Sequence, residues 1–191
     1  MTKVAVIYGS VREGRLGIKA AKFIVKKLER RNIESTLIDP LEFPLPLLKN
    51  KFDYLKENEK TKEMKKLHEI FEKADGFVIV TGEYNHSVPP ALKNIVDYFG
   101  REYAFKPSAI VSYSMGPFGG VRAMMHWRDI LSELGMPSIP TTFPIPEVQN
   151  AFDDDGNPKD EKYNERVKKF IDEFDWYIKT FRAGREKGIP N

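Results

Sequence analysis

Short apolar runs rich in branched side chains recur along the chain, separated by longer and more polar segments. Apolar runs without polar alternation are typical of strands that are buried on both faces, as in parallel sheets. The pattern therefore predicts five buried strands, at residues 4–8, 36–38, 77–80, 109–111 and 139–143.

The segments between these runs carry apolar residues at helical spacing. The pattern predicts helices over residues 18–28, 64–71, 89–99, 121–134 and 160–181. Pro89 and Pro90 suit a first helical turn, and Gly135 suits the position just past a helix C-terminus. The aromatic side chains of the last helix share one side, which indicates core or interface packing rather than cofactor contact.

Strands and helices that alternate five times predict a three-layer α/β fold around a five-stranded parallel sheet. The 191 residues fit a single domain that spans residues 1–191. Two long loops interrupt the alternation: residues 40–48, where prolines separate apolar residues, and residues 144–158, which carry a run of aspartates. Loops longer than about 12 residues in a compact domain tend to be functional or disordered.

The amino-acid composition excludes several kinds of catalytic and metal site, and it gives weaker indications about binding partners. The chain has no cysteine, which excludes disulfides, thiolate metal sites, iron–sulfur clusters and a cysteine nucleophile. The formal net charge is only +3, and lysines alternate with acids, so we expect no nucleic-acid partner. No apolar stretch approaches the ~20 residues that span a bilayer, and the N-terminus lacks a signal-peptide layout. We therefore expect a cytoplasmic protein without membrane association.

In an open α/β sheet, ligands bind outside the carboxyl ends of the strands. The loop after the first predicted strand reads Gly9-Ser10-Val11-Arg12-Glu13-Gly14-Arg15-Leu16-Gly17. Small residues permit a tight turn there, and the following helix start attracts anions, while Ser10, Arg12 and Arg15 add donors. Neither a Walker-type lysine nor the dinucleotide glycine pattern is present. The loop thus predicts a monophosphate site, with an ordinary strand–helix turn as the alternative.

The loop after the third predicted strand crowds polar and aromatic side chains ahead of a helix that begins with proline. Tyr84 is suited to cover an aromatic ring, and the amide of Asn85 to donate and accept at the edge of a heterocycle. For His86, a structural or exposed role is more common than a catalytic one. Glu83 is expected to hold the loop rather than to touch substrate.

The loop after the fourth predicted strand, residues 112–122, is rich in glycine, which permits close approach of the backbone to a flat ligand. It is not the nucleophile elbow of hydrolases, because Ser112 stands where that motif has its first glycine. The acidic run at residues 153–155 lacks the ligand spacing of an EF-hand. We expect no metal site and name no catalytic residue.

Taken together, the three loops resemble those of the NADPH-dependent FMN reductase family, flavodoxin-like proteins that include quinone, azo-dye and chromate reductases. The resemblance covers roughly residues 3–143, and its middle motif is the most specific. The matching segments are Gly9-Ser10-x-Arg12-x-x-Arg15-x-Gly17, Glu83-Tyr84-Asn85-x-Ser87-x-Pro89-x-x-Leu92-Lys93-Asn94-x-x-Asp97-Tyr98 and Ser114-x-Gly116-x-x-Gly119-Gly120-x-x-Ala123.

The resemblance implies a sheet in the strand order 2-1-3-4-5, with FMN at the switch between strands one and three, as in flavodoxin itself. Carried over by position, Ser10, Arg12, Arg15, Gly17 and Ile18 would hold the FMN phosphate. The isoalloxazine would be lined by Glu83, Tyr84, Asn85 and His86, mainly through backbone amides, and its other edge by Ser114, Gly116, Gly119 and Gly120.

The implied activity is an FMN-dependent NAD(P)H oxidoreductase that passes hydride through flavin N5 to quinones, flavins, azo compounds or similar acceptors in a ping-pong mechanism. NADPH or NADH would be the co-substrate, and the protein would be a homodimer or homotetramer. The apolar loop over residues 41–48 would then lie under a partner subunit or border the acceptor site. Three alternatives stay open: a flavodoxin-like electron carrier, a flavin-binding module without turnover, and a nucleotide-binding protein without flavin.

Overall fold

The computed structural model of the protein describes residues 1–190 and contains one parallel sheet. Its strands are β1 (Lys3–Tyr8), β2 (Glu34–Ile38), β3 (Gly76–Gly82), β4 (Ser108–Tyr113) and β5 (Phe143–Ile145). All neighbours pair in parallel, in the order β2-β1-β3-β4-β5. This confirms the predicted fold class and strand order. The direction of winding reverses between β1 and β3, which is where open α/β sheets leave a crevice.

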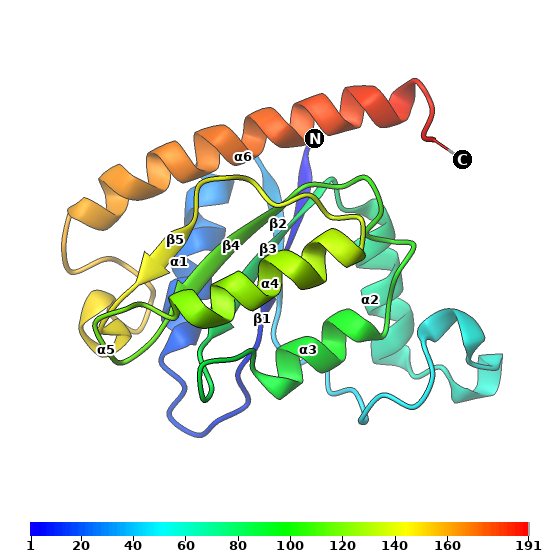
Figure 1. Ribbon diagram of the computed structural model, residues 1–191, viewed down its shortest axis with the longest axis horizontal. Coiled ribbons are helices and arrows are strands. Elements are labelled where there is room, and N and C mark those ends of the chain that lie inside the picture. Colours follow the sequence, from blue (N-terminus) through cyan, green and yellow to red (C-terminus); the bar gives the residue numbers. More distant parts are fainter. Residues whose placement is uncertain (191) are drawn as a thin grey trace.

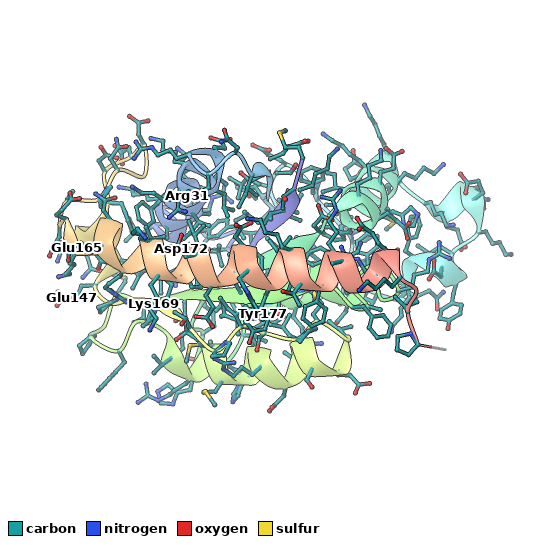
Figure 2. The ribbon with its side chains drawn as sticks, turned by 90° about the horizontal axis from the view of Figure 1, so that it is seen from above. Arg31, Glu147, Glu165, Lys169, Asp172 and Tyr177 are labelled. Carbon is teal, nitrogen blue, oxygen red and sulfur yellow. The ribbon has the colours of Figure 1, made fainter. Side chains whose placement is uncertain are left out.

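The helices cover both faces of the sheet. They are α1 (Gly17–Glu29), α2 (Lys62–Lys73), α3 (Pro90–Asp97), α4 (Val121–Glu133), α5 (Val148–Ala151) and α6 (Lys162–Glu186), with short 3₁₀ turns η1 (Phe52–Tyr54) and η2 (Glu57–Glu59). Figure 1 shows α4 in front of the sheet and α1 behind it. In Figure 2, α6 runs the length of the molecule, with α1 on one side and α4 on the other.

The core consists of two apolar clusters, one on each face of the sheet. The first joins the sheet to α1, α5 and α6, and the second joins it to α2, α3 and α4. Successive strand residues point to opposite faces, so Val78 belongs to the first cluster and its neighbour Ile79 to the second. Because helices cover both faces, the ends of the strands are the main places where a ligand can approach the sheet.

The fifth strand differs from its prediction. It spans Phe143–Ile145 instead of residues 139–143, while Ser138 makes only an isolated bridge to Ser108. Pro140 lies between the two paired segments and has no N–H for a sheet ladder. Its carbonyl instead accepts a hydrogen bond from Arg128. The predicted loop over residues 144–158 consequently contains the end of β5 and the short helix α5.

The proline-rich loop over residues 40–48 is held against the second cluster. Phe43 is buried, and Asn94 on α3 both donates to the carbonyl of Pro46 and accepts from the N–H of Leu48, at 2.9 Å each. Leu47 nevertheless remains 82% exposed. On α6, Phe170 and Phe174 are buried in the first cluster, in agreement with the packing role predicted for this stripe. Among the described residues, no helix combines the length and hydropathy needed to cross a membrane.

Candidate functional site

The loops that follow β1, β3 and β4 meet at the carboxyl end of the sheet, at the lower side of Figure 1. They enclose a cleft of about 300 Å³, at the lower end of the range for small-molecule sites. The residues that line the cleft are Ser10, Arg12, Glu13, Gly14, Arg15, Leu16, Gly82, Glu83, Tyr84, Tyr113, Ser114, Met115 and Val148.

The loop after β1 presents donors to one end of this cleft. The Ser10 hydroxyl is 3.0 Å from the hydroxyl of Tyr84 and accepts a hydrogen bond from the backbone N–H of Arg12 at 3.3 Å. The Arg12 side chain is exposed, with its guanidinium 5.7 Å from the ring centroid of Tyr84. Leu16 precedes α1 and has no side-chain acceptor to cap it. The first N–H groups of α1 are thus left to solvent or to an anionic ligand.

Arg15, the second arginine among the predicted phosphate ligands, already binds a carboxylate of the protein. Its two terminal nitrogens donate to both carboxylate oxygens of Asp39, at 2.5 and 2.6 Å, and this bond raises the pKa of the guanidinium. Asp39 follows β2 directly and is absent from the predicted site residues. Only the pairing of β1 with β2 brings it beside the loop, so composition and spacing carry no signal for it.

The loop after β3 forms a tight two-residue turn. Tyr84 and Ser87 exchange backbone hydrogen bonds at 3.0 and 2.9 Å, and the residues between them, Asn85 and His86, have φ of +48° and +64°. Two positive φ values are characteristic of a type I′ turn, which asparagine tolerates better than most residues. Both side chains are exposed at the tip, and neither lines the cleft.

Glu83 caps the start of α4. Its carboxylate accepts hydrogen bonds from the backbone N–H groups of Arg122 at 3.0 Å and Ala123 at 3.4 Å, and it lies 3.4 Å from the Arg122 guanidinium. A carboxylate at a helix N-terminus satisfies free donors and interacts favourably with the helix dipole. Glu83 therefore fixes the loop after β3 to α4, the holding role expected from the sequence.

Tyr113, at the end of β4, forms the floor of the cleft. Its close packing is the reason why glycine is found at three neighbouring positions. A Cβ added at Gly17 would lie 2.0 Å from the Tyr113 ring, and one at Gly82 would lie 3.1 Å from it. At Gly120, where φ is +76°, an added Cβ would lie 2.6 Å from the Tyr113 carbonyl oxygen. Gly17 and Gly120 are thus required by packing within the protein, whatever ligand binds.

The remaining predicted residues shape the loop after β4. Gly119 has a φ of +63°, and a Cβ there would lie 3.0 Å from the backbone nitrogen of Ile145. The Ser114 hydroxyl donates to the carbonyl of Gly116 at 3.0 Å, and the Ser114 carbonyl accepts from the N–H of Val148. The loop is thereby joined to β5 and α5, which bring Val148 to the cleft.

Two buried phenols support the cleft from below. The ring centroids of Tyr8 and Tyr113 are 6.4 Å apart. Burial raises the pKa of Tyr8 and raises the pKa of Tyr113 well above its usual value, so both hydroxyls keep their protons at neutral pH. The buried Tyr8 hydroxyl has no hydrogen-bond partner within residues 1–190.

Of the thirteen predicted site residues, six line the cleft: Ser10, Arg12, Arg15, Glu83, Tyr84 and Ser114. Gly17 and Ile18 begin α1 beside it, and Asn85, His86, Gly116, Gly119 and Gly120 belong to loops that form its walls. The sequence interpretation missed Asp39, Tyr113 and Val148. The cleft combines hydrogen-bond donors with the aromatic rings of Tyr84 and Tyr113, so the residues present fit a phosphate joined to a flat ring, as in FMN.

Comparison with known proteins agrees with this chemistry. The sequence profile of the NADPH-dependent FMN reductases matches residues 2–150. A quinone reductase of Pseudomonas putida is 31% identical over 188 residues, which cover 94% of this chain and 96% of the relative. A quinone reductase of Escherichia coli strain K12 is 49% identical over 69 residues, 34% of this chain and 37% of the relative.

Among solved structures, the flavoenzyme NAD(P)H:(acceptor) oxidoreductase FerB from Paracoccus denitrificans has the same fold. It superposes with a TM-score of 0.78 at 27% sequence identity, covering 95% of this chain and 99% of FerB. The family profile spans most of the chain, and a relative above 30% identity aligns along nearly all of it. The protein is therefore a member of the NADPH-dependent FMN reductase family, an oxidoreductase that uses FMN and NAD(P)H.

Proposed function

We propose that this protein reduces small-molecule acceptors such as quinones, free flavins or azo compounds, with FMN held in the cleft between the loops after β1, β3 and β4. The observation that carries the proposal is the polarity of this cleft. The Ser10 hydroxyl and the exposed Arg12 guanidinium line this cleft, and the aromatic rings of Tyr84 and Tyr113 line it beside these donors.

The phosphate end is assigned to the loop after β1. The Ser10 hydroxyl, the Arg12 guanidinium and the first N–H groups of α1 at Gly17 and Ile18 donate to the phosphate. Arg15 contributes to the same end, although Asp39 binds two of its nitrogens. Charge-assisted hydrogen bonds of this kind are stronger than neutral ones, which suits anchoring of the cofactor at its phosphate.

The ring end is assigned to the other two loops. Backbone groups of the turn at Glu83, Tyr84, Asn85 and His86 face one edge of the ring, and Ser114, Gly116, Gly119 and Gly120 close the other. FMN bound there would supply the hydride chemistry between NADPH or NADH and the acceptor, and we expect the two substrates to use one position in turn, as in a ping-pong mechanism. The protein contributes binding, orientation and access, and no side chain is assigned as a catalytic acid or base.

The decisive experiment is an absorption spectrum of the purified protein reconstituted with FMN, recorded without oxygen before and after NADPH or NADH is added. Flavin bands that bleach on addition and return when a quinone is supplied support the proposal, and initial rates at several fixed quinone concentrations test for the parallel lines of a ping-pong mechanism. FMN binding without NAD(P)H oxidation would favour the electron carrier or the binding module. A preparation that does not bind FMN would contradict the proposal.

If Arg12 binds the phosphate, Arg12→Ala should lose affinity for FMN but not for riboflavin. Removing a charge-assisted hydrogen bond should weaken FMN binding by about 1–3 kcal/mol, or roughly 5- to 150-fold. Riboflavin, which lacks the phosphate, should bind the variant and the wild type alike. Fluorescence titrations with both flavins measure this, and Arg30→Ala at the far end of α1 is the control. Unchanged FMN affinity in Arg12→Ala would show that the phosphate binds elsewhere.

A homodimeric or homotetrameric, cytoplasmic protein completes the proposal. Leu41 and Leu47 on the proline-rich loop are 56% and 82% exposed, and burial of such leucines in an assembly is favourable. Light scattering at micromolar concentration should give a multiple of the 22.0 kDa chain mass. A monomer whose loop over residues 40–48 is readily cleaved by protease would contradict this interface.

A further inference from the structure

The side chains of Arg15 and Asp39 form the most enclosed arginine–carboxylate pair next to the cleft. Their side chains are 18% and 5% exposed, and both terminal nitrogens of Arg15 contact the carboxylate. Asp39 is itself fixed, because it accepts the backbone N–H of Leu41 at 3.0 Å and lies directly after β2. The loop after β1 is therefore attached at Arg15 to a rigid strand end.

The same guanidinium also closes the loop upon itself. One terminal nitrogen of Arg15 donates to the carbonyl of Ser10 at 3.0 Å, in addition to its bond to Asp39. This contact joins the first and last parts of the loop, and the Ser10 hydroxyl accepts the N–H of Arg12 between them. The positions of the Ser10 hydroxyl and the Arg12 backbone thus depend on where Asp39 holds Arg15.

Two roles for Arg15 can be separated on physical grounds. As a direct phosphate ligand, it would bind more strongly without Asp39, because the carboxylate neutralises its charge and lies close to the incoming anion. As a brace, it needs Asp39, because the bidentate pair fixes the plane of the guanidinium. Three of its five N–H donors are already used by Asp39 and Ser10, whereas the exposed Arg12 side chain has its guanidinium over the ring of Tyr84.

We propose that Asp39 is a positioning residue for the cofactor phosphate, acting through Arg15 to hold the Ser10–Arg12 segment in its binding conformation. This inference rests on the proposed function. A buried ion pair adds little net stability over apolar packing, so conformational definition of a binding loop is a reason to retain one. The removal of Asp39 is accordingly expected to weaken phosphate recognition rather than to release Arg15 for it.

The test measures the affinities of FMN and riboflavin for the full-length protein and three variants by fluorescence titration, together with apo-protein melting curves. In Asp39→Asn, FMN affinity should fall about tenfold or more, the scale of one charge-assisted hydrogen bond, while riboflavin affinity is unchanged. Arg15→Lys should show the same selective loss, because lysine keeps the charge but cannot span both carboxylate oxygens and the Ser10 carbonyl. Asp75→Asn, which breaks an arginine pair at the other end of the sheet, should leave the ratio of the two affinities at its wild-type value.

Two outcomes overturn the positioning role: unchanged or tighter FMN binding in Asp39→Asn, or wild-type FMN affinity in Arg15→Lys. If Asp39→Asn does not fold, wild-type FMN affinity in Arg15→Lys still overturns the positioning role. A parallel loss of FMN and riboflavin affinity would also overturn it, because a merely structural defect affects both flavins. Failure of the wild type to bind FMN at all would contradict the proposed function itself, and is distinguishable because it appears before any variant is compared.

Discussion

At each end of the sheet an aspartate binds arginine, yet the two clusters serve different parts of the molecule. At the carboxyl end, Asp39 holds Arg15 of a short polar loop beside the cleft. At the amino end, Asp75 accepts the N–H of Lys3 at 3.0 Å and a bond from Arg185 at 3.2 Å, with Arg182 at 3.7 Å. The first cluster fixes a loop, and the second joins β1 and β3 to the last turns of α6.

The two clusters differ in how far the surrounding structure depends on their polar contacts. The loop at Arg15 has few apolar contacts of its own, so its conformation depends on polar bonds that a ligand can complete. The end of α6 and the start of β1 belong to the packed fold, so the bonds of Asp75 add to burial that already exists. The same pair of residue types thus defines a binding loop in one place and supports tertiary packing in the other.

The strongest test of the carboxyl end is Gly17→Ala. The added Cβ would lie 2.0 Å from the ring of Tyr113, so either α1 or the floor of the cleft must shift. We expect a loss of about 3 kcal/mol in the free energy of unfolding, at the upper end of the usual cost of overpacking, together with weaker binding of both flavins.

The matched control for that substitution is Gly184→Ala near the end of α6, where an added Cβ meets nothing within 4 Å. Replacement of an exposed helical glycine by alanine should stabilise the protein by about 0.5–1 kcal/mol. Chemical denaturation monitored by circular dichroism gives both values. Gly17→Ala with wild-type stability would contradict the packing between Tyr113 and the start of α1.

The second prediction removes the aspartate at the amino end. Asp75→Asn should lower the free energy of unfolding by about 1–2 kcal/mol, less than for a fully buried pair because the Arg182 and Arg185 side chains are partly exposed. Hydrogen exchange should accelerate in the last turns of α6 and at the start of β1. Faster hydrogen exchange in the loop after β1 instead would contradict the conclusion that Asp75 supports tertiary packing and Asp39 supports the binding loop.

The alternation of apolar runs is sufficient to predict β1, β3 and β4, because parallel strands that are buried on both faces need continuous apolar sequence. The edge strand β2 is only partly buried, and the pattern predicts only its last three residues. The strand order follows from the family resemblance. The pattern places the fifth strand too early, since Ile139 is apolar and buried but Pro140 interrupts the ladder. Apolar character alone does not reveal where backbone pairing resumes.

At the site, the local loop compositions identify the cleft, but not the partners that reach it from distant parts of the sequence. Asp39 and Arg15 are 24 positions apart, and only the register of β1 against β2 brings them together. The glycines suggest close approach of a ligand, whereas Gly17 and Gly120 accommodate Tyr113. Local sequence thus indicates what a loop can bind. The packing of neighbouring strands decides which of its residues already contact other parts of the protein.

The smallest predicted effect concerns the ammonium group of Lys106, which lies near Arg185 at the amino end of the sheet. Lys106 donates to the carbonyls of Phe71 and Glu72 at the end of α2. Burial, followed by the nearby charge of Arg185, lowers the pKa of Lys106 from 10.5 to about 8. Between these pH values the unfolded chain binds more protons at this residue than the folded chain, so the free energy of unfolding should rise with pH.

Because Lys106 is partly exposed, solvent screening reduces this contribution to about 1 kcal/mol between pH 8 and pH 10. Denaturation curves for the wild type and Lys106→Met across this range isolate it, since other titrating groups are shared. The wild type should gain stability relative to the variant as pH rises, because the neutral amine still donates to α2 without the cost of a buried charge. A difference that is constant with pH would show that Lys106 keeps its proton in the folded protein, so that the arginine cluster at the amino end adds no pH-dependent cost of this kind to the fold.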